Sequence, residues 1–485
     1  MSRIRRTVRA IVEPIALLTA AAPLLAAPLS GRGRTHGPAS RVRRSLRFST
    51  AEGMFVEVFN ACAGPTVLTG FALWLGATPL QVALVGQLPT IAPLVQLPAA
   101  WVTSALGRRR TALVTIALSR QVLLPLAVLP FLPIGRDTAR AVLLWVAAAS
   151  AVLGVVGNNA WTAWMGDLVP ERLRGRYFGG RTAVCILAGM GASLASGRFL
   201  DAAGHHAATG PALAILAVLA SAVGALTTWL MSRQHEPGGE PAAPHDPRVM
   251  LRPFLDPSAR PFLVFQLAWN GAVGIGGGFY TFHLLHNLRA GFTVVALQAA
   301  GMSALRVLSA PLWGKAIDRL GARPVLAACT FGLACLPAVW IFATPTFLWP
   351  FALDAVLGGV FWGGYYLAAF AVPLAIAPRR ERPFYLGAFA MAGGLATAVA
   401  TAAGGLLAGA LPARFEALGH VTYAVHVLFV ASALARFAAA FLALRIEERG
   451  AGTLVQLQAL ARGAVSDALA DARVRVASAR VGTRR

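Results

Sequence analysis

Ionisable side chains lie inside several long apolar runs of this 485-residue sequence. Glu57 and Asp354 each lie a turn or two inside such a run, and Arg306 lies near the middle of another. A carboxyl group removed from water can hold a proton near neutral pH, so either acid is a candidate proton carrier. A deeply placed guanidinium favours an anionic group or a counter-carboxylate. These residue types point to proton transfer and anion binding in an apolar environment.

Each of these charges also has a structural interpretation. Glu57 could neutralise Arg120, which lies similarly deep in the third apolar run, and Asp354 could neutralise Arg306. Arg120 is expected to be mainly structural. Glu52, closer to the start of its run, is expected to be solvated.

Amide and aromatic side chains occur in the first, fourth, seventh and tenth apolar runs. Amides can hydrogen-bond a solute and indole rings can stack on one, although hydrogen bonds between helices would explain any single amide. Trp161 and Trp164 are instead expected to anchor the chain at the membrane interface. The predicted substrate-binding residues are Asn60, Asn159, Gln266, Asn270, Arg306, Trp362 and Tyr365, with Asn158 and Trp269 nearby.

The composition requires that such residues lie in a membrane. Hydrophobic residues make up 57% of the chain and charged residues 13%, with a mean hydropathy of +0.65, whereas soluble domains carry about 25% charged residues. The net charge of +24 does not indicate nucleic acid, because the arginines form short clusters between apolar runs. The cysteines and histidines show no metal-ligand spacing, so no metal, cofactor or catalytic residue is predicted.

Twelve apolar runs are long enough to cross a membrane, which requires about 20 residues each. They lie near residues 51–75, 79–105, 111–133, 140–165, 178–200, 210–232, 261–285, 293–313, 324–343, 347–373, 384–409 and 421–444. The sequence therefore predicts an all-α integral membrane protein with six helices in residues 51–232 and six in residues 259–445. The other predicted regions are a basic tail at 1–50, a linker at 233–258 and a second basic tail at 446–485.

Arginine clusters fall in alternate loops, which predicts a multi-pass protein of the cell membrane with both termini in the cytoplasm. Residues 11–29 are apolar, but Glu13 and three prolines weaken them as a span. We expect a tail that rests on anionic lipid, with a thirteenth span as the alternative.

Several landmarks repeat between the two sets of helices. PERLRGRYFG, from Pro170, and PRRERPFYLG, from Pro378, are 208 residues apart, and Asn60 and Asn270 are 210 apart. The segments LGRRR and LGARP, in the loops before the third and ninth runs, are offset by 214 residues. Two related halves of this kind are typical of transporters that bind substrate between the halves near the bilayer midplane.

Residues 314–323, GKAIDRLGAR, match the pattern G-x-x-x-D-R-x-G-x-R through Gly314, Asp318, Arg319, Gly321 and Arg323. At this position, between the eighth and ninth spans, the pattern resembles the major facilitator superfamily, and DLVPERLRGRYFGGR is similar to that family's loop between the fourth and fifth spans. The resemblance covers about residues 51–445. The first-half copy departs from the pattern, with Ala100, Ser104 and Ala105 in place of Gly314, Asp318 and Arg319. The fifth span also lacks the GPxxGG pattern of many drug–proton antiporters.

The resemblance implies a latch that closes the cytoplasmic side. Pseudo-twofold symmetry between the halves predicts that Asp318 faces the start of the fifth span, against Arg174, Arg176 or the amides near Tyr177. The alternative is a loop whose arginines contact only lipid phosphates. Glycines at 271–279 predict a bend in the seventh span, and those of the eleventh predict close helix approach.

These features predict a secondary active transporter that moves a small organic solute across the cell membrane by alternating access. Proton coupling through Glu57 or Asp354 is an option that the sequence leaves open. The expected partners are the solute, membrane lipid and protons, with no nucleic acid, and the expected state is a monomer. A membrane sensor that keeps the fold without transport is the alternative. A membrane-embedded transferase is a weaker one, because no nucleophile or acid–base pair is evident.

Overall fold

The computed structural model describes residues 38–236, 250–378, 381–417, 420–448, 450–460 and 462. The side chains of residues 38–40, 171–172, 174–175, 417 and 420–421 are outside that description. The predicted tails up to residue 37 and beyond residue 462, the alternative span at 11–29 and residues 237–249 of the linker also lie outside the described residues.

The N-terminal half contains the first six spans. In chain order, its elements are α2 (Pro38–Ala63) and α3 (Pro65–Trp74); α4 (Pro79–Ile91), η2 (Ala92–Val95) and α5 (Gln96–Leu106); α6 (Arg108–Gln121), η3 (Leu124–Ala127) and η4 (Leu129–Phe131); α7 (Arg136–Leu168); α8 (Glu171–Gly204); and α9 (Thr209–Ser232).

The C-terminal half contains the other six, after a short helix α10 (Arg252–Leu255). Its elements are α11 (Arg260–Gly277), α12 (Tyr280–Phe282) and the π-helix η6 (His283–Asn287); α13 (Phe292–Leu320); α14 (Ala322–Ala334), α15 (Leu336–Val339) and η7 (Trp340–Phe342); α16 (Trp349–Ile376); α17 (Arg382–Ala410); and α18 (Ala424–Ala443). A small antiparallel hairpin, β1 (Arg414–Ala417) and β2 (His420–Tyr423), precedes α18.

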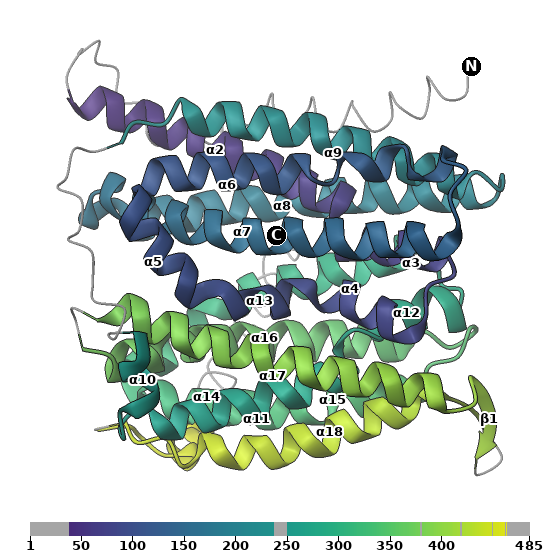
Figure 1. Ribbon diagram of the computed structural model, residues 1–485. Coiled ribbons are helices and arrows are strands. Elements are labelled where there is room, and N and C mark those ends of the chain that lie inside the picture. The colour runs from purple at the N-terminus through teal and green to yellow at the C-terminus, as the bar shows by residue number, and fades with distance from the viewer. Residues whose placement is uncertain are drawn as a thin grey trace, which may run out of the picture.

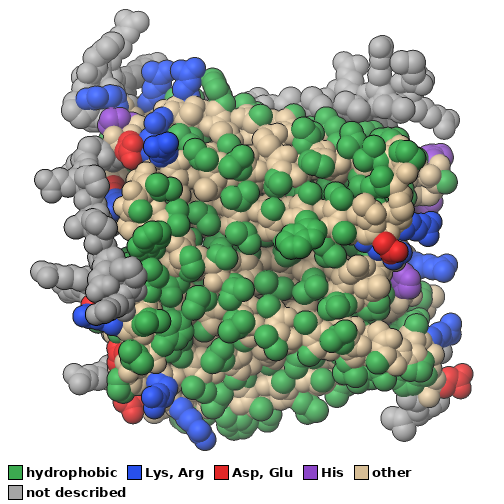
Figure 2. All heavy atoms as spheres, viewed as in Figure 1, with side chains coloured by type: hydrophobic (Ala, Val, Ile, Leu, Met, Phe, Trp, Pro, Cys, Tyr) green, Lys and Arg blue, Asp and Glu red, His purple; other side chains and the backbone are tan. Residues whose placement is uncertain are grey.

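Among the described residues, twelve helical segments are long and apolar enough to cross a membrane, which agrees with the twelve spans predicted there. The two halves lie side by side, with the N-terminal half above the C-terminal half in Figure 1. We call the left-hand edge, which carries α10, the linker face, and the right-hand edge, which carries β1, the hairpin face. Figure 2 shows hydrophobic side chains over the side of the molecule and charged ones gathered at these two edges, as a membrane-spanning protein requires.

The first helix begins at Pro38, well before the predicted start near residue 51. Its early turns are helical because they pack on the N-terminal half: Ser45, Leu46 and Ser49 are buried, and the amide of His235 donates to the Ser45 hydroxyl over 2.8 Å. The last part of the predicted tail 1–50 therefore belongs to the first span.

The repeat seen in the sequence is present in the packing. α2 packs on α8 and α9, as α11 packs on α17 and α18. The hydroxyl of Tyr177 donates to the carbonyl of Leu46 over 3.3 Å, and that of Tyr385 donates to the carboxylate of Asp256 over 2.6 Å. This bond, aided by Ser258 and opposed by slight burial, holds the pKa of Asp256 below its usual range. The sequence repeat aligns Tyr177 with Tyr385, and the two hydroxyls form hydrogen bonds at equivalent places in the two halves. Together with the matching helix packing, this shows two pseudo-symmetric six-helix bundles.

The halves meet along two lines, α17 against α4, η2 and α5, and α13 against α8. The predicted close approach of the eleventh span is the first of these. A Cβ added at Gly394 would lie 2.6 Å from the amide nitrogen of Leu94, and one at Gly405 would lie 2.7 Å from the Cα of Leu80. Only glycine permits backbones to pack this closely.

The predicted interruption of the seventh span is also present. α11 ends at Gly277, and a turn separates it from α12 and η6. A Cβ at Gly278 would lie 2.5 Å from the carbonyl oxygen of Ala83 in the other half. Gly278 therefore lets the interrupted seventh span pack directly against α4 of the N-terminal half.

Candidate functional site

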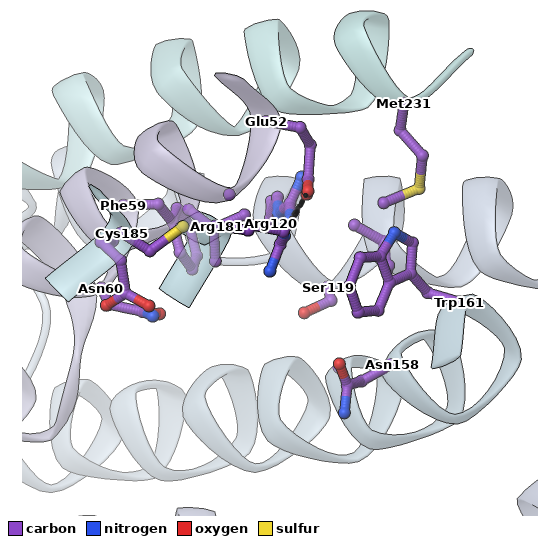
Figure 3. A pocket seen from close by; sticks show the side chains of 15 residues that line it. Glu52, Phe59, Asn60, Ser119, Arg120, Asn158, Trp161, Arg181, Cys185 and Met231 are labelled. Atoms are coloured by element: carbon purple, nitrogen blue, oxygen red, sulfur yellow. Dashed lines mark hydrogen bonds and ion pairs between the residues drawn. The ribbon is translucent and has the colours of Figure 1, made fainter. Parts of the chain in front are cut away.

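A polar cavity of about 330 Å³ lies within the N-terminal half, among α2, α6, α7, α8 and α9 (Figure 3). Its volume suits a ligand of metabolite size. The lining residues are Glu52, Gly53, Val56, Glu57, Phe59, Asn60, Ile116, Ser119, Arg120, Gly154, Asn158, Trp161, Arg181, Cys185 and Met231.

One wall of the cavity is a buried charge cluster that we call the Glu52 triad, formed by Glu52, Arg120 and Arg181. Glu52 Oε1 lies 3.2 Å from Arg120 Nη2, and Glu52 Oε2 lies 3.3 Å from Arg181 Nη2. Arg120 also donates to the hydroxyl of Thr227, and Arg181 Nε donates to the carbonyl of Ser49 over 3.2 Å. Each of the three charged groups thus has at least two polar contacts, which a charge cluster inside a membrane needs.

The triad corrects two predictions. Glu52 is 3% exposed, so it is buried and not solvated. It, and not Glu57, is the carboxylate that neutralises Arg120. The structural interpretation of Arg120 is confirmed, since its guanidinium is held by a fixed ion pair within one half.

Glu57 lies one turn and a half further along α2 and faces the same cavity. Its carboxylate packs against Gly189 of α8, where an added Cβ would lie 3.3 Å from Oε2, and it is hydrogen-bonded by the side chain of Asn60. Among the described residues it forms no ion pair. The guanidinium of Arg306, from the other half, nevertheless lies within electrostatic range of it.

Arg306 is half-buried on α13 and lies over one aromatic ring. Its guanidinium carbon lies 5.8 Å from the ring centroid of Tyr366 on α16, and Trp362 stacks on Tyr366 with centroids 5.5 Å apart. In the described part of the chain, no hydrogen bond or ion pair engages the guanidinium. Tyr366 was missed by the sequence reasoning, although its spacing of four from Trp362 places both on one helix face.

Asp354 lies apart from this site, so it does not neutralise Arg306. It is 8% exposed, accepts a hydrogen bond from Gln298 Nε2 over 2.9 Å, and faces the charge of Arg436 on α18. Arg436 is 3% exposed, and its Nη2 lies 3.4 Å from the Tyr280 hydroxyl. Arg436 was also missed; its only signal was an arginine within the last apolar run.

The predicted amides separate into two groups. Asn60 lines the cavity with its neighbour Asn158. Asn159 turns away, and its Oδ1 accepts from Gln96 Nε2 over 3.4 Å. In the C-terminal half, Asn270 Nδ2 donates to the carbonyl of Gln266 over 2.9 Å, and the Gln266 Oε1 is buried without a partner among the described residues.

The predicted aromatic residues form a cluster beneath Arg306. Trp269 is fully buried and Tyr365 is 5% exposed, with ring centroids 5.5 Å apart. Trp362 packs edge-on against both, with centroids 6.3 Å and 5.2 Å away. Trp269 and Tyr365 therefore support Trp362 and Tyr366 from behind, and only the latter pair is available to a solute.

The two tryptophans predicted as interfacial anchors are both engaged by other parts of the protein. Trp164 is 1% exposed and its Nε1 donates to the carbonyl of His235 over 3.1 Å. Trp161 lines the cavity, with the guanidinium of Arg181 4.7 Å from its ring centroid. Helix packing holds Trp164, and the cation–π contact with Arg181 holds Trp161.

On the hairpin face, a carboxylate joins the two halves. Asp201, near the end of α8, accepts hydrogen bonds from the amides of Phe292 and Thr293 over 2.7 and 2.9 Å, and from the Thr293 hydroxyl over 2.6 Å. These groups begin α13, so the negative charge sits at the positive end of a helix. We call this contact the Asp201 clasp.

The linker face differs at the same pair of helices. Asp318 and Arg176 are both exposed, and in the described part of the chain neither forms an ion pair. The side chain of Arg174 lies outside the described residues, and the hydroxyl of Tyr177 is bonded to Leu46. The predicted latch is thus not formed with Arg176 in this conformation, and it stays a prediction for a state closed on the linker face.

The other residues of the 314–323 pattern shape the turn. Gly321 has φ +85°, a conformation that favours glycine. Glu448 accepts hydrogen bonds from the amides of Ala322 and Arg323 over 3.1 and 2.7 Å. Gly314 has open space around it, and Arg319 is exposed.

Residues 271–477 match the family model described as Major Facilitator Superfamily. Among solved structures, the chain is similar to the nucleoside transporter NupG, with 11% identity over 83% of this chain and 98% of that one, and a TM-score of 0.60. It is also similar to a D-xylose-proton symporter, with 12% identity over 85% and 100% and a TM-score of 0.62. A bacterial homologue of the iron transporter ferroportin, in an inward-facing state, has 14% identity over 85% and 100% and a TM-score of 0.61. At these identities the likeness shows the fold. No curated protein sequence matches the chain.

Proposed function

We propose that the chain, whose residues 271–477 match the Major Facilitator Superfamily model and which shares its fold with solved transporters, is a secondary transporter that moves a small organic solute by alternating access. The observation that carries the proposal is the asymmetry between its faces. The halves are clasped at the hairpin face through Asp201, while Asp318 and Arg176 are unpaired at the linker face. A polar cavity lies inside the membrane region between these levels. A solute reaching it from the linker face would have to leave after the clasp opens.

We further propose that the linker face is cytoplasmic, since the arginine clusters gather in its loops. We also propose a monomer as the transporting unit. Glu57 is the proposed proton-coupling group, in preference to Asp354, because it faces the cavity and lies within range of a charge from the other half. A solute that changes the Glu57–Arg306 interaction changes the relative stability of the two states, which is how binding shifts a conformational equilibrium.

The Asp201→Asn variant is expected to open the hairpin face. It keeps the shape of the side chain but replaces charge-assisted hydrogen bonds to a helix N-terminus, each worth about 1.5–3 kcal/mol when charged. We expect a cysteine placed at Ala296, behind the clasp, to react about tenfold faster with an impermeant thiol reagent from the hairpin side, in a chain whose native cysteines are replaced. Asp137→Asn, an exposed acid on the same face, is the matched control. An unchanged rate in Asp201→Asn would contradict the role of the clasp.

A further inference from the structure

Arg306 is a cation whose guanidinium has no hydrogen-bond or ion-pair partner among the described residues. A charge inside a membrane is costly unless it is paired, and the other deep guanidiniums do have polar partners: Arg120 contacts Glu52, and Arg436 contacts Tyr280. Arg306 has only the ring of Tyr366 among the described residues. A cation–π contact fixes the guanidinium without using its five N–H donors.

The charges around Glu57 favour an anion as that partner. From α2, Glu52 faces it; from α8, Arg181 and the thiol of Cys185; and from α13, Arg306. Arg120 of α6 completes the lining. Two arginines share Glu52, so the Glu52 triad carries one net positive charge, and Glu57 and Arg306 cancel. The site is therefore positive by one charge when Glu57 is ionised, and by two when Glu57 is protonated.

We propose that the solute is a small organic monoanion, whose negative group binds Arg306 and which crosses the membrane together with one proton carried on Glu57. The proposal rests on the transport function proposed above and names its substrate class. The proton forms an O–H bond with the Glu57 carboxylate on one side of the membrane and is released to water on the other, so nothing is oxidised or reduced. One anion and one proton move per cycle, and no net charge crosses.

The coupling follows from electrostatics at one site. An anion bound to Arg306 neutralises the positive charge near Glu57 and so favours protonation of Glu57. Protonation of Glu57 in turn favours anion binding. This reciprocity is a thermodynamic requirement for two ligands that share a site. A cationic solute would instead compete with the proton for Glu57 and would meet an arginine-rich wall.

The test uses reconstituted full-length protein, an internal pH indicator and three pools of matched skeletons. The anion pool holds lactate, gluconate and benzoate; the amide pool holds lactamide, gluconamide and benzamide; and the amine pool holds 1-amino-2-propanol, glucamine and benzylamine. Proton uptake in protein-free liposomes is subtracted, because some weak acids cross lipid unaided. We expect proton uptake with the anion pool alone, more than tenfold lower in Arg306→Gln and partly retained in Arg306→Lys, which keeps the charge but not the planar fork.

The variants separate recognition from folding. Arg306→Gln and Arg306→Lys are compared at equal reconstituted amounts, and each must elute as a single species in detergent. Proton uptake with the amide or amine pool alone would overturn the anion assignment and leave transport standing. Anion-driven uptake unchanged in Arg306→Gln would overturn the role of Arg306. Silence with all three pools would count against the transport function itself.

Discussion

The Glu57→Gln variant is expected to lose proton-driven solute accumulation while keeping solute exchange. Glutamine is close in size to a protonated glutamate and cannot release a proton. The protein with solute bound can therefore still change between its two states, but a pH gradient cannot drive transport. Glu57 has no ion pair among the described residues and is hydrogen-bonded by Asn60, so the substitution breaks no ion pair among them. We expect accumulation to fall at least about tenfold, which corresponds to about 1.4 kcal/mol.

The measurement uses proteoliposomes with an imposed proton gradient and an internal pH indicator, and it compares Glu57→Gln with Asp354→Asn. Asp354 is buried inside the C-terminal half beside Gln298 and away from the cavity, so its variant should retain proton-driven uptake. Loss of uptake in Asp354→Asn with Glu57→Gln unaffected would move the coupling role to Asp354.

The Glu52→Gln variant is expected to have the largest effect on stability. Glu52 is the shared counter-ion of Arg120 and Arg181, so its replacement leaves two guanidiniums unneutralised in a buried site. Removing one partner of a buried ion pair typically costs about 3–5 kcal/mol. We expect a marked fall in the temperature at which the detergent-solubilised protein aggregates, and a low yield of folded protein.

Two further variants make this test specific. Asp167→Asn breaks an ion pair with Arg108 in which both side chains are largely exposed, and exposed pairs contribute little, so its aggregation temperature should match the unmodified protein. Glu52→Leu combined with Arg120→Met removes a carboxylate and one guanidinium together. It should be more stable than Glu52→Gln, because one fewer cation is left unneutralised. Equal aggregation temperatures for Glu52→Gln and Asp167→Asn would contradict the proposed stabilising role of the triad.

The fold could be predicted because the membrane imposes strong rules. A backbone in lipid must satisfy its own hydrogen bonds, so a long apolar run means a spanning helix. The two halves follow from landmarks such as Tyr177 and Tyr385, which form equivalent contacts with Leu46 and Asp256. The glycines at 271–279 likewise predicted the break after Gly277, because their backbone preferences act locally.

The site could be predicted only in part, because depth and facing direction depend on tertiary structure. Glu52 seemed close to water because the apolar run was measured from residue 51. The helix begins at Pro38, 14 residues before Glu52, so Glu52 lies about 21 Å along it. The choice between Glu52 and Glu57 as the partner of Arg120 depends on which side of α2 faces α6, and a single sequence does not determine that orientation.

Other functional residues gave no signal because their role exists only across the halves. Asp201 ends an apolar run, where an acid would ordinarily be solvated, and it becomes a clasp only because α13 begins beside it. Tyr366 gains its role from Arg306 on another helix. Conversely, Tyr365 and Trp269 were expected at the site because of their types, yet they pack behind it.

The central claim is that the two faces open in turn, and double electron–electron resonance between spin labels tests it most directly. Labels at Gly179 and Lys315 would span the halves at the linker face, and labels at His206 and Thr346 would span them at the hairpin face; all four positions are exposed. With native cysteines replaced, the account predicts that changing pH with a transported solute present shortens one distance as the other lengthens. Distances that change together, or not at all, in protein that transports would contradict alternating access.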